Sequence, residues 1–351
     1  MSKSAPERWE SGSDFHFCEN TAFLRHADGS APISEPKLAF FISGRTALTA
    51  LIRFGMQQHG WTRIYFPSYY CHDVIDYVRQ AGIETYSYAH NPFMDGKDAA
   101  LDVPDQSGSV MVCTNYFGVF RPTPKSFART MVIEDVTHDI LSYQTSVADY
   151  CFGSLRKELP VPVGGFCTAG ADTAGFAPVH WPQGESVAAL KLSAMYLKSR
   201  YLEGHADKDI YRRLFTEGEA MLAHCPQDAA MPLLARAVLS SLNTSAIATA
   251  KQNNLGRAKQ MLDLATIDFN GVRVFAQGLG LTLLCRHQTQ RDLLKDRLVS
   301  QNIFPAILWP DQNREHDKEI ASRILFIHLD YRYGLQDVET IVNCINDFFA
   351  A

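Results

Sequence analysis

The segment YCFGSLRKELPVPVGGF, residues 150–166, places a lysine directly after a strand-like apolar run and before a sharp turn. Lysine is seldom buried without a reason, and the pKa of a lysine that is desolvated beside another cation falls. The neutral amine of Lys157 would then be a nucleophile able to form a Schiff base, with Arg156 as the neighbouring cation. A loop lysine whose ammonium group reaches solvent is the alternative that this segment alone leaves open.

A second segment, SGRTAL, lies at the end of a predicted strand and at the start of a predicted helix. It contains Ser43, Gly44, Arg45 and Thr46. The glycine allows close backbone approach, and the exposed amides of a helix N-terminus, with the Thr46 hydroxyl, can hold a phosphate group. Taken alone, the segment is also explained by ordinary helix capping.

A third segment, VIEDVTHD, puts Glu134, Asp135 and His138 at the end of a predicted buried strand. A carboxylate at such a place needs a cation or several hydrogen-bond donors, because burial otherwise raises its pKa and neutralises it. We therefore expect a positive group to face Asp135. A helix-capping Asp135 and a solvated His138 are the alternatives for this segment alone.

Together the three segments supply a phosphate site, an acid for a buried cation and an amine for an aldehyde. Pyridoxal 5'-phosphate (PLP) carries the complementary groups: a phosphate, a ring nitrogen that is protonated when paired with a carboxylate, and an aldehyde that condenses with lysine. The combination therefore predicts PLP as the cofactor.

The surrounding pattern predicts the elements that position these segments. Short apolar runs alternate with helical patterns, which is typical of a mostly parallel sheet covered on both faces, with ligands beyond the carboxyl ends of its strands. The strand candidates are 37–43, 63–67, 83–88, 109–118, 130–135, 148–154 and 164–169, and the first two helix candidates are 44–60 and 72–82.

The rest of the chain predicts a second, smaller unit. The pattern is helical from about 185 to 239, residues 245–265 read as a long helix, and strands and helices then mix as in a compact α+β unit. We place the boundary near residue 245, which gives a large cofactor-binding domain over 1–245 and a small C-terminal domain over 246–351.

Bulk composition favours a small-molecule enzyme. The 351 residues are 46% hydrophobic and 20% charged, and 33 basic against 38 acidic residues give a net charge of −5 without long runs of either sign. This charge provides no electrostatic case for binding nucleic acid or an anionic membrane. The N-terminus lacks the apolar core of a signal peptide, no apolar stretch reaches membrane-spanning length, and the eight cysteines lack CxxC spacing. We therefore expect a cytoplasmic protein with reduced thiols rather than disulfides or a metal site.

The three segments together resemble the DegT/DnrJ/EryC1/StrS aminotransferases, a sugar-aminotransferase-like branch of the fold type I PLP enzymes. The family's phosphate segment is matched by residues 44–48, and its acidic segment by Glu134, Asp135 and His138. The most specific match is a Schiff-base lysine followed seven and eight residues later by two glycines, here Lys157, Gly164 and Gly165. The resemblance covers about 43–168 and, more faintly, 323–342.

The resemblance implies a fold type I transferase, with a mostly parallel seven-stranded sheet in its large domain, that forms a homodimer with shared active sites. It assigns Lys157 as the cofactor lysine and proton carrier, and Asp135 as the partner of the ring nitrogen. His138 would lie near the phenolic oxygen, and the phosphate would be anchored by Gly44, Arg45, Thr46 and Ser154.

Two positions depart from the family pattern. The family's serine five residues before the lysine is replaced by Phe152, and Ser154 is its candidate substitute from a different offset. Where the family has an aromatic residue that stacks on the cofactor ring, this chain has Cys71, and either Tyr70 or His72 could take over that role. Residues 170–245 match the family poorly, so substrate specificity does not transfer.

The resemblance favours transfer of an amino group from an amino acid donor to a keto-sugar nucleotide or a similar keto compound. Another PLP reaction, such as elimination or decarboxylation, and a non-catalytic PLP-binding regulator are the alternatives. Retention of Lys157 argues against the family's sugar dehydratases, which have histidine there. The residue that binds the donor carboxylate stays open among Arg257, Arg323 and Arg332.

Overall fold

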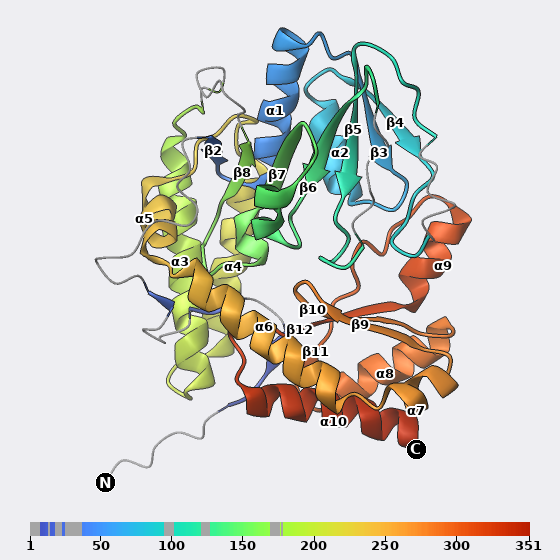
Figure 1. Ribbon diagram of the computed structural model, residues 1–351. Helices are drawn as coiled ribbons and strands as arrows, with labels where there is room; N and C mark the ends of the chain where they lie inside the picture. The colour runs from blue at the N-terminus through green and yellow to red at the C-terminus, as the bar shows by residue number, and fades with distance from the viewer. Residues whose placement is uncertain are drawn as a thin grey trace.

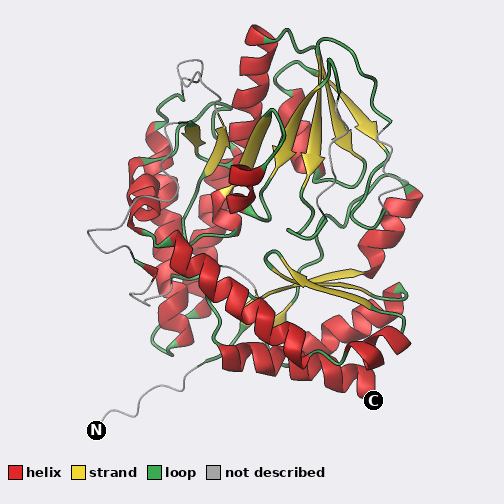
Figure 2. Cartoon of the chain, viewed as in Figure 1, coloured by secondary structure: helices red, strands yellow, loops and turns green. Residues whose placement is uncertain are grey.

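A computed structural model describes residues 8–12, 15–17, 23–24, 37–94, 102–120, 127–168, 176 and 178–351. Figures 1 and 2 show a large α/β part built on one sheet and, next to it, a smaller part built on a second sheet with helices on its outer side. The expected α/β architecture is therefore present.

The large sheet has the strand order β2-β8-β7-β6-β5-β3-β4. Neighbouring strands from β7 to β4 are parallel, whereas β8 is antiparallel to both of its neighbours. The strands are β2 (Leu38–Phe41), β3 (Arg63–Pro67), β4 (Glu84–Tyr88), β5 (Ser109–Thr114), β6 (Met131–Asp135), β7 (Tyr150–Ser154) and β8 (Gly165–Thr168). Each lies within a predicted range, and the mostly parallel seven-stranded sheet is confirmed.

Apolar side chains cover both faces of this sheet, as predicted. Successive residues of a strand point to opposite faces, so Phe40 packs in the cluster that contains Val187, while Phe41 packs in the cluster that contains Leu48 and Leu51. The helices that follow strands of the sheet are α1 (Gly44–Gln58) and α2 (His72–Arg79), and those of the middle region are α3 (Pro182–Leu202), α4 (Lys208–Ala223) and α5 (Leu233–Ser241).

The second sheet is antiparallel and has the order β12-β10-β9. Its outer face carries Leu281, Leu283, Leu325 and Ile327, which pack in one cluster with residues of the surrounding helices. Phe326 lies between two of these positions and faces the opposite side, toward the large sheet. The elements of this part are α7 (Leu264–Phe269), β9 (Arg273–Gln277), β10 (Gly280–Leu284), α8 (Gln288–Ser300), β11 (Ile303–Phe304), α9 (Glu315–Arg323), β12 (Ile324–His328) and α10 (Leu335–Ala350).

Helix α6 (Thr244–Met261) connects the two parts (Figure 1). Ile247, near its start, packs in the core of the large part, whereas Leu255 packs in the core of the small part. The first described residues also contribute to the small part, because β1 (Ser11–Gly12) pairs in parallel with β11. The division of the chain near residue 245 stays a proposal.

Three further findings concern the described residues only. No described helix is both long and apolar enough to cross a membrane. No group of three or more histidine, cysteine, aspartate or glutamate side chains in the described part of the chain could hold a metal ion. No disulfide joins the seven described cysteines, and Cys18 lies outside the described residues.

Candidate functional site

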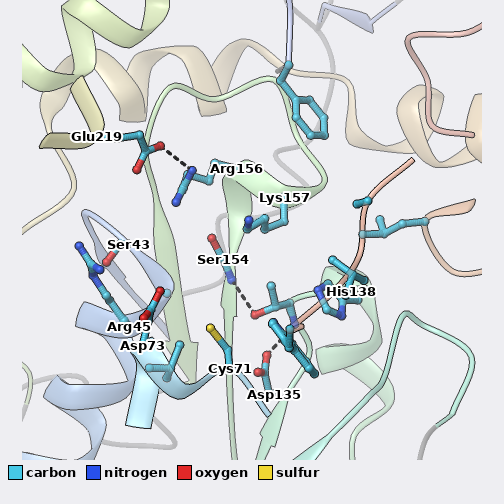
Figure 3. Close-up of a pocket in the computed structure, with 18 of the residues that line it drawn as sticks. Ser43, Arg45, Cys71, Asp73, Asp135, His138, Ser154, Arg156, Lys157 and Glu219 are labelled. Atoms are coloured by element: carbon cyan, nitrogen blue, oxygen red, sulfur yellow. Dashed lines mark hydrogen bonds and ion pairs between the residues drawn. The ribbon is translucent and has the colours of Figure 1, made fainter. Parts of the chain in front are cut away.

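A cavity of about 470 Å³ lies between the carboxyl ends of the large sheet's strands and the inner face of the second sheet. This volume is typical of pockets for small molecules and cofactors. Gly44, Arg45, Tyr70, Cys71, Asp135, His138, Ser154 and Lys157 all line it. Figure 3 shows Lys157 and Asp135 set apart from each other, with Ser43 and Arg45 on one side and His138 on the other. The fold therefore brings together the predicted cofactor-binding residues except Thr46, whereas His72 and the three candidate arginines do not line the cavity.

Lys157 ends a single 3-10 turn, Leu155–Lys157, that begins where β7 ends. The turn is fixed by the backbone bond from Leu155 N to Gly164 O (3.0 Å). The buried side chain of Glu158 fixes it further, since this carboxylate accepts from Ile140 N (2.8 Å) and is ion-paired with Lys251 of α6. These contacts hold the turn in place, so that Lys157 projects into the cavity.

The amine of Lys157 forms no hydrogen bond or ion pair with any residue that the structure describes. The Lys157 side chain is exposed to the open cavity. The neighbouring Arg156 guanidinium and desolvation by the surrounding protein lower its pKa to about 8, against the opposing effect of Glu219. Arg156 Nη1 is itself 2.8 Å from Glu219 Oε1, and Lys191 of α3 is ion-paired with the same carboxylate. Lys157 is thus a nucleophile with an unusually large neutral fraction near neutral pH.

This arrangement predicts opposite effects of two substitutions on the pKa of Lys157. Arg156→Gln removes the charge that lowers the pKa most, whereas Glu219→Gln removes a charge that raises it. Because only the neutral amine attacks an aldehyde, attachment of PLP at a fixed pH below 8 should slow in Arg156→Gln by about tenfold per pKa unit gained, and should accelerate in Glu219→Gln. Stopped-flow absorbance over a pH series measures both rates.

The control for this experiment is Arg200→Gln, in the last turn of α3. The substitution breaks the ion pair between Arg200 and Glu203, and neither residue lines the cavity. Its pH profile should match that of the unsubstituted chain. A shift in the same direction in Arg156→Gln and Glu219→Gln would contradict the assignment of these charges.

Asp135 is the last residue of β6 and is buried. Its Oδ2 accepts from the Tyr70 hydroxyl (2.6 Å) and its Oδ1 from Thr137 N (2.9 Å). Burial raises its pKa, and these two hydrogen bonds oppose that effect. No cation of the described chain forms an ion pair with Asp135. The carboxylate therefore has a fixed orientation and lines the cavity, where a bound positive group could pair with it.

The hydroxyl of Tyr70 is committed to Asp135, and its ring lies against Phe66 (5.4 Å between centroids) and Trp309 (5.5 Å). The Cys71 side chain borders the cavity, and burial raises the pKa of its thiol. His72 does not line the cavity, since its ring lies beside Asn313. Of the two substitutes considered for the stacking residue, only Tyr70 is therefore near the site, and it positions the acid.

His138 is neutral, because burial, the charge of Lys157 and His328 lower its pKa to about 3. Its Nδ1 accepts from Phe117 N (3.3 Å), so the proton of the neutral ring is on Nε2. The ring lies beside those of Phe117 (5.7 Å between centroids) and Trp309 (5.6 Å), which also contact each other (6.0 Å). His138 thus presents one N–H donor at the side of the cavity opposite Arg45 (Figure 3).

The N-terminus of α1 forms the side of the cavity that Ser43 and Arg45 occupy. Ser43 caps the helix, and its Oγ accepts from Thr46 N (3.2 Å). The N–H groups of Gly44 and Arg45 have no acceptor among the described residues, so this helix end offers two backbone donors. The Arg45 guanidinium is held against the wall by Leu222 O (3.1 Å).

Thr46 has a different place from the one predicted. It is fully buried, and its hydroxyl is 2.8 Å from Ser43 Oγ, behind the cavity wall. The hydroxyl that lines the cavity belongs to Ser43, with that of Ser154 nearby. A role for Thr46 in direct phosphate contact stays a prediction, and the geometry favours Ser43 instead.

The paired glycines permit this helix end to lie against β8. A Cβ atom on Gly165 would be 2.3 Å from the carbonyl carbon and oxygen of Ser43 and 2.4 Å from Gly44 N. Gly164 has φ +149°, a conformation that side chains disfavour. Gly165 therefore allows the close contact between β8 and the start of α1, which explains why glycine follows the lysine at this spacing.

Sequence reasoning missed the wall that faces the large sheet. Lys191 and Glu219 come from the middle helices, and Trp309 from the loop before α9. Phe117 and Trp309 both have positive φ, 58° and 54°, which is uncommon for large residues and frequent at functional sites. Helical periodicity distinguishes buried from exposed faces but gives no indication of which buried positions border a cavity.

None of the three arginines considered for the donor carboxylate lines the cavity. Arg257 pairs with Glu339 and Arg323 with Glu319. Arg332 is buried and paired with Asp330. The cations that do line the cavity are Arg45, Arg156, Lys157 and Lys191.

Comparison with solved structures shows the fold. The sugar aminotransferase CalS13 from Micromonospora echinospora is 14% identical, with 93% of this chain and 94% of that chain aligned and a TM-score of 0.57. NtdA from Bacillus subtilis, solved with bound cofactor PMP, is 12% identical over 90% of this chain and 73% of that one, with a TM-score of 0.58. Serine palmitoyltransferase from Sphingomonas wittichii is 15% identical, with 89% of this chain and 71% of that chain aligned and a TM-score of 0.54. No protein-family model and no curated protein sequence matches the chain. At these identities the likeness shows the fold alone, the one that these three structures share.

Proposed function

We propose that this chain is a PLP-dependent aminotransferase of the DegT/DnrJ/EryC1/StrS type, which transfers an amino group from an amino acid to a keto-sugar nucleotide or a similar keto compound. One observation carries the proposal. Lys157, whose amine has a lowered pKa, and Asp135, a buried carboxylate without a cation, line one cavity and lie apart from each other in it (Figure 3). Each lacks the partner that a pyridine aldehyde would provide.

The side chains around the cavity match the chemical groups of PLP and the order of those groups around its ring. On the pyridine ring of PLP the aldehyde is opposite the nitrogen, and the phosphate arm and the phenolic oxygen lie on the two sides of the aldehyde. In the cavity Lys157 is opposite Asp135, and the start of α1 is opposite His138. The residues that would hold the cofactor are therefore Lys157, Asp135, His138, Ser43, Gly44, Arg45 and Ser154.

When bound, PLP supplies an electron sink for the pair of electrons left at the donor carbon after it loses a proton. Lys157 Nζ would take that proton and hold it until it returns to the reacting molecule. Asp135, fixed by Tyr70 and Thr137, stabilises positive charge at the ring nitrogen. The His138 Nε2–H would donate to the phenolic oxygen, and the apolar side chains of Phe117 and Trp309 exclude water.

The likeness to a sugar aminotransferase and to a structure solved with PMP supports this proposal. Small-molecule amino donors and keto acceptors are the partners it requires. A cytoplasmic homodimer with shared active sites, as the family resemblance implies, belongs to the same proposal, as does the domain boundary near residue 245.

The test is a half-reaction of the full chain loaded with PLP. A suitable amino acid should convert the cofactor to its amine form, and a keto acid should reverse the change, both followed by absorbance. Product analysis separates transamination from elimination or decarboxylation. If a broad panel of amino acids leaves the spectrum unchanged while the cofactor is attached to Lys157, the aminotransferase proposal fails in favour of a regulator. Such an outcome would fit the departures at Cys71 and Phe152, which remove contacts that orient the ring.

A further inference from the structure

A second cavity, of about 390 Å³, lies beyond the carboxyl ends of β3 and β4, next to the start of α9. Figure 1 shows α9 beside the ends of these two strands. The cavity shares no lining residue with the first one. Its position follows the rule that open parallel sheets bind ligands beyond the carboxyl ends of their strands.

The floor of this cavity holds a buried carboxylate. Asp317, in the first turn of α9, is 2% exposed, and its Oδ2 has no hydrogen-bond partner in the described part of the chain. The carboxylate accepts hydrogen bonds from the side chains of Ser68 and Asn91, which leave Oδ2 without a partner. Burial raises its pKa, and Arg314 and His316 lie near enough to oppose that effect without forming an ion pair with it. A buried carboxylate oxygen without a donor is costly, and folded proteins keep very few of them. The arrangement therefore suits a ligand that donates hydrogen bonds to Asp317.

The other floor groups restrict the charge of that ligand. Ser68 Oγ is 3.2 Å from both His90 N and His90 O, and its hydroxyl also hydrogen-bonds to the Asp317 carboxylate. Asn91 Oδ1 accepts from Phe93 N (3.0 Å). Burial lowers the pKa of His90 to about 4, so its ring is neutral. Asp317 is the one charged side chain on the described floor, which favours a cationic group over an anion.

The rim carries one cation, the Arg314 guanidinium, among the described lining residues. Arg314 and His316 are exposed at the mouth, and the Arg314 guanidinium has one hydrogen bond among the described residues, a long contact of 3.5 Å to Ser87 O. A bond of this length constrains a side chain weakly. Arg314 is therefore able to meet a carboxylate at the mouth while Asp317 meets an ammonium group at the floor.

We propose that this second cavity binds a small zwitterion of the α-amino acid class, its ammonium group on Asp317 and its carboxylate toward Arg314. The inference depends on the groups of this cavity and is independent of the proposed function, since it uses no residue of the first site. The second cavity would be a further site for an amino acid. Unlike the first cavity, it has no nucleophilic lysine among its described lining residues.

Isothermal calorimetry on the full chain tests the proposal with glycine, L-alanine and L-glutamate, and with ethylamine and acetate as partial ligands. Binding of the amino acids should weaken on the order of ten- to a hundredfold in Asp317→Asn, because a charged partner is lost. Asp311→Asn, an exposed aspartate outside both cavities, is the matched control and should bind normally. Arg314→Ala should weaken amino acids while leaving ethylamine unchanged.

Lys157→Ala distinguishes the two sites, since it disables the first cavity and should leave binding at the second intact. Loss of binding in Lys157→Ala with retention in Asp317→Asn would assign the amino acid to the first cavity and overturn the proposal. Equal affinity in Asp317→Asn and in the unsubstituted chain would overturn it as well. The thermal unfolding midpoint gives an independent readout: Asp317→Asn should keep or raise it, because the substitution removes a buried charge that forms no ion pair while the amide oxygen can still accept from Ser68 or Asn91. A lowered midpoint would indicate a structural role and contradict the inference.

Discussion

Replacing Lys157 with alanine should abolish covalent attachment of PLP and suppress amino-group transfer on the order of a thousandfold or more, since nucleophile and proton carrier are lost together. The amine points into the cavity and has no partner among the described residues, so its removal should leave the fold intact. Borohydride reduction followed by peptide mass spectrometry should find the pyridoxyl group on the Lys157 peptide of the unsubstituted chain and nowhere in the variant.

Lys191 provides the matched control, because it lines the same cavity and is the other lysine that could attack an aldehyde. It is ion-paired with Glu219, and an amine held in an ion pair stays protonated and a poor nucleophile. Lys191→Ala should therefore keep the reducible adduct on Lys157. A pyridoxyl group on Lys191 in the unsubstituted chain would refute the assignment of Lys157.

The edge of the large sheet could be predicted from the sequence because its geometry is local and repetitive. Parallel strands of alternating units end on one edge, so a carboxylate that ends β6 and a lysine just after β7 must lie at the same edge of the sheet. The same rule brings the start of α1 to that edge. Asp135, Lys157 and Gly44 were therefore identifiable without any knowledge of tertiary contacts.

The opposite wall could not be predicted, for two physical reasons. Its residues come from helices and a loop far along the chain, and an amphipathic pattern fixes only the buried face of a helix. Glu219 is a partly exposed acid on α4 that resembles any surface glutamate until Arg156 and Lys191 are placed beside it. Trp309 depends on a left-handed backbone conformation that no sequence rule assigns to tryptophan.

The position of Tyr70 shows how a substitution in the family pattern can be misread from sequence alone. Counting places Cys71 at the stacking position, which suggests that a neighbouring aromatic ring replaces the missing one. In the structure the Tyr70 hydroxyl instead donates to Asp135, so its contribution is to orient the acid. Because of this contact, a substitution that tests the charge of Asp135 should keep an oxygen that can accept from Tyr70.

Asp135→Asn should suppress turnover on the order of a hundredfold or more while leaving the fold intact. The amide oxygen can still accept one of the two hydrogen bonds from Tyr70 and Thr137, so the side chain should keep its place. A neutral amide cannot stabilise positive charge on the ring nitrogen, and the electron sink is weakened without that charge. Steady-state kinetics with PLP-loaded protein measure the loss, and reducible attachment at Lys157 should persist.

Glu134→Gln is the control, because Glu134 precedes Asp135 on β6, is also buried and does not line the cavity. The Glu134 carboxylate accepts a hydrogen bond from Ser146 Oγ, so Glu134→Gln should lower the free energy of unfolding. Its effect on the turnover of each folded molecule should be small. Tyr70→Phe completes the set: it removes one donor to Asp135 but keeps the charge, and its turnover should lie between those of Asp135→Asn and the unsubstituted chain. Unchanged turnover in Asp135→Asn would show that this carboxylate does not face the ring nitrogen. A loss in Glu134→Gln equal to that in Asp135→Asn would show instead that any disturbance of β6 disables the site.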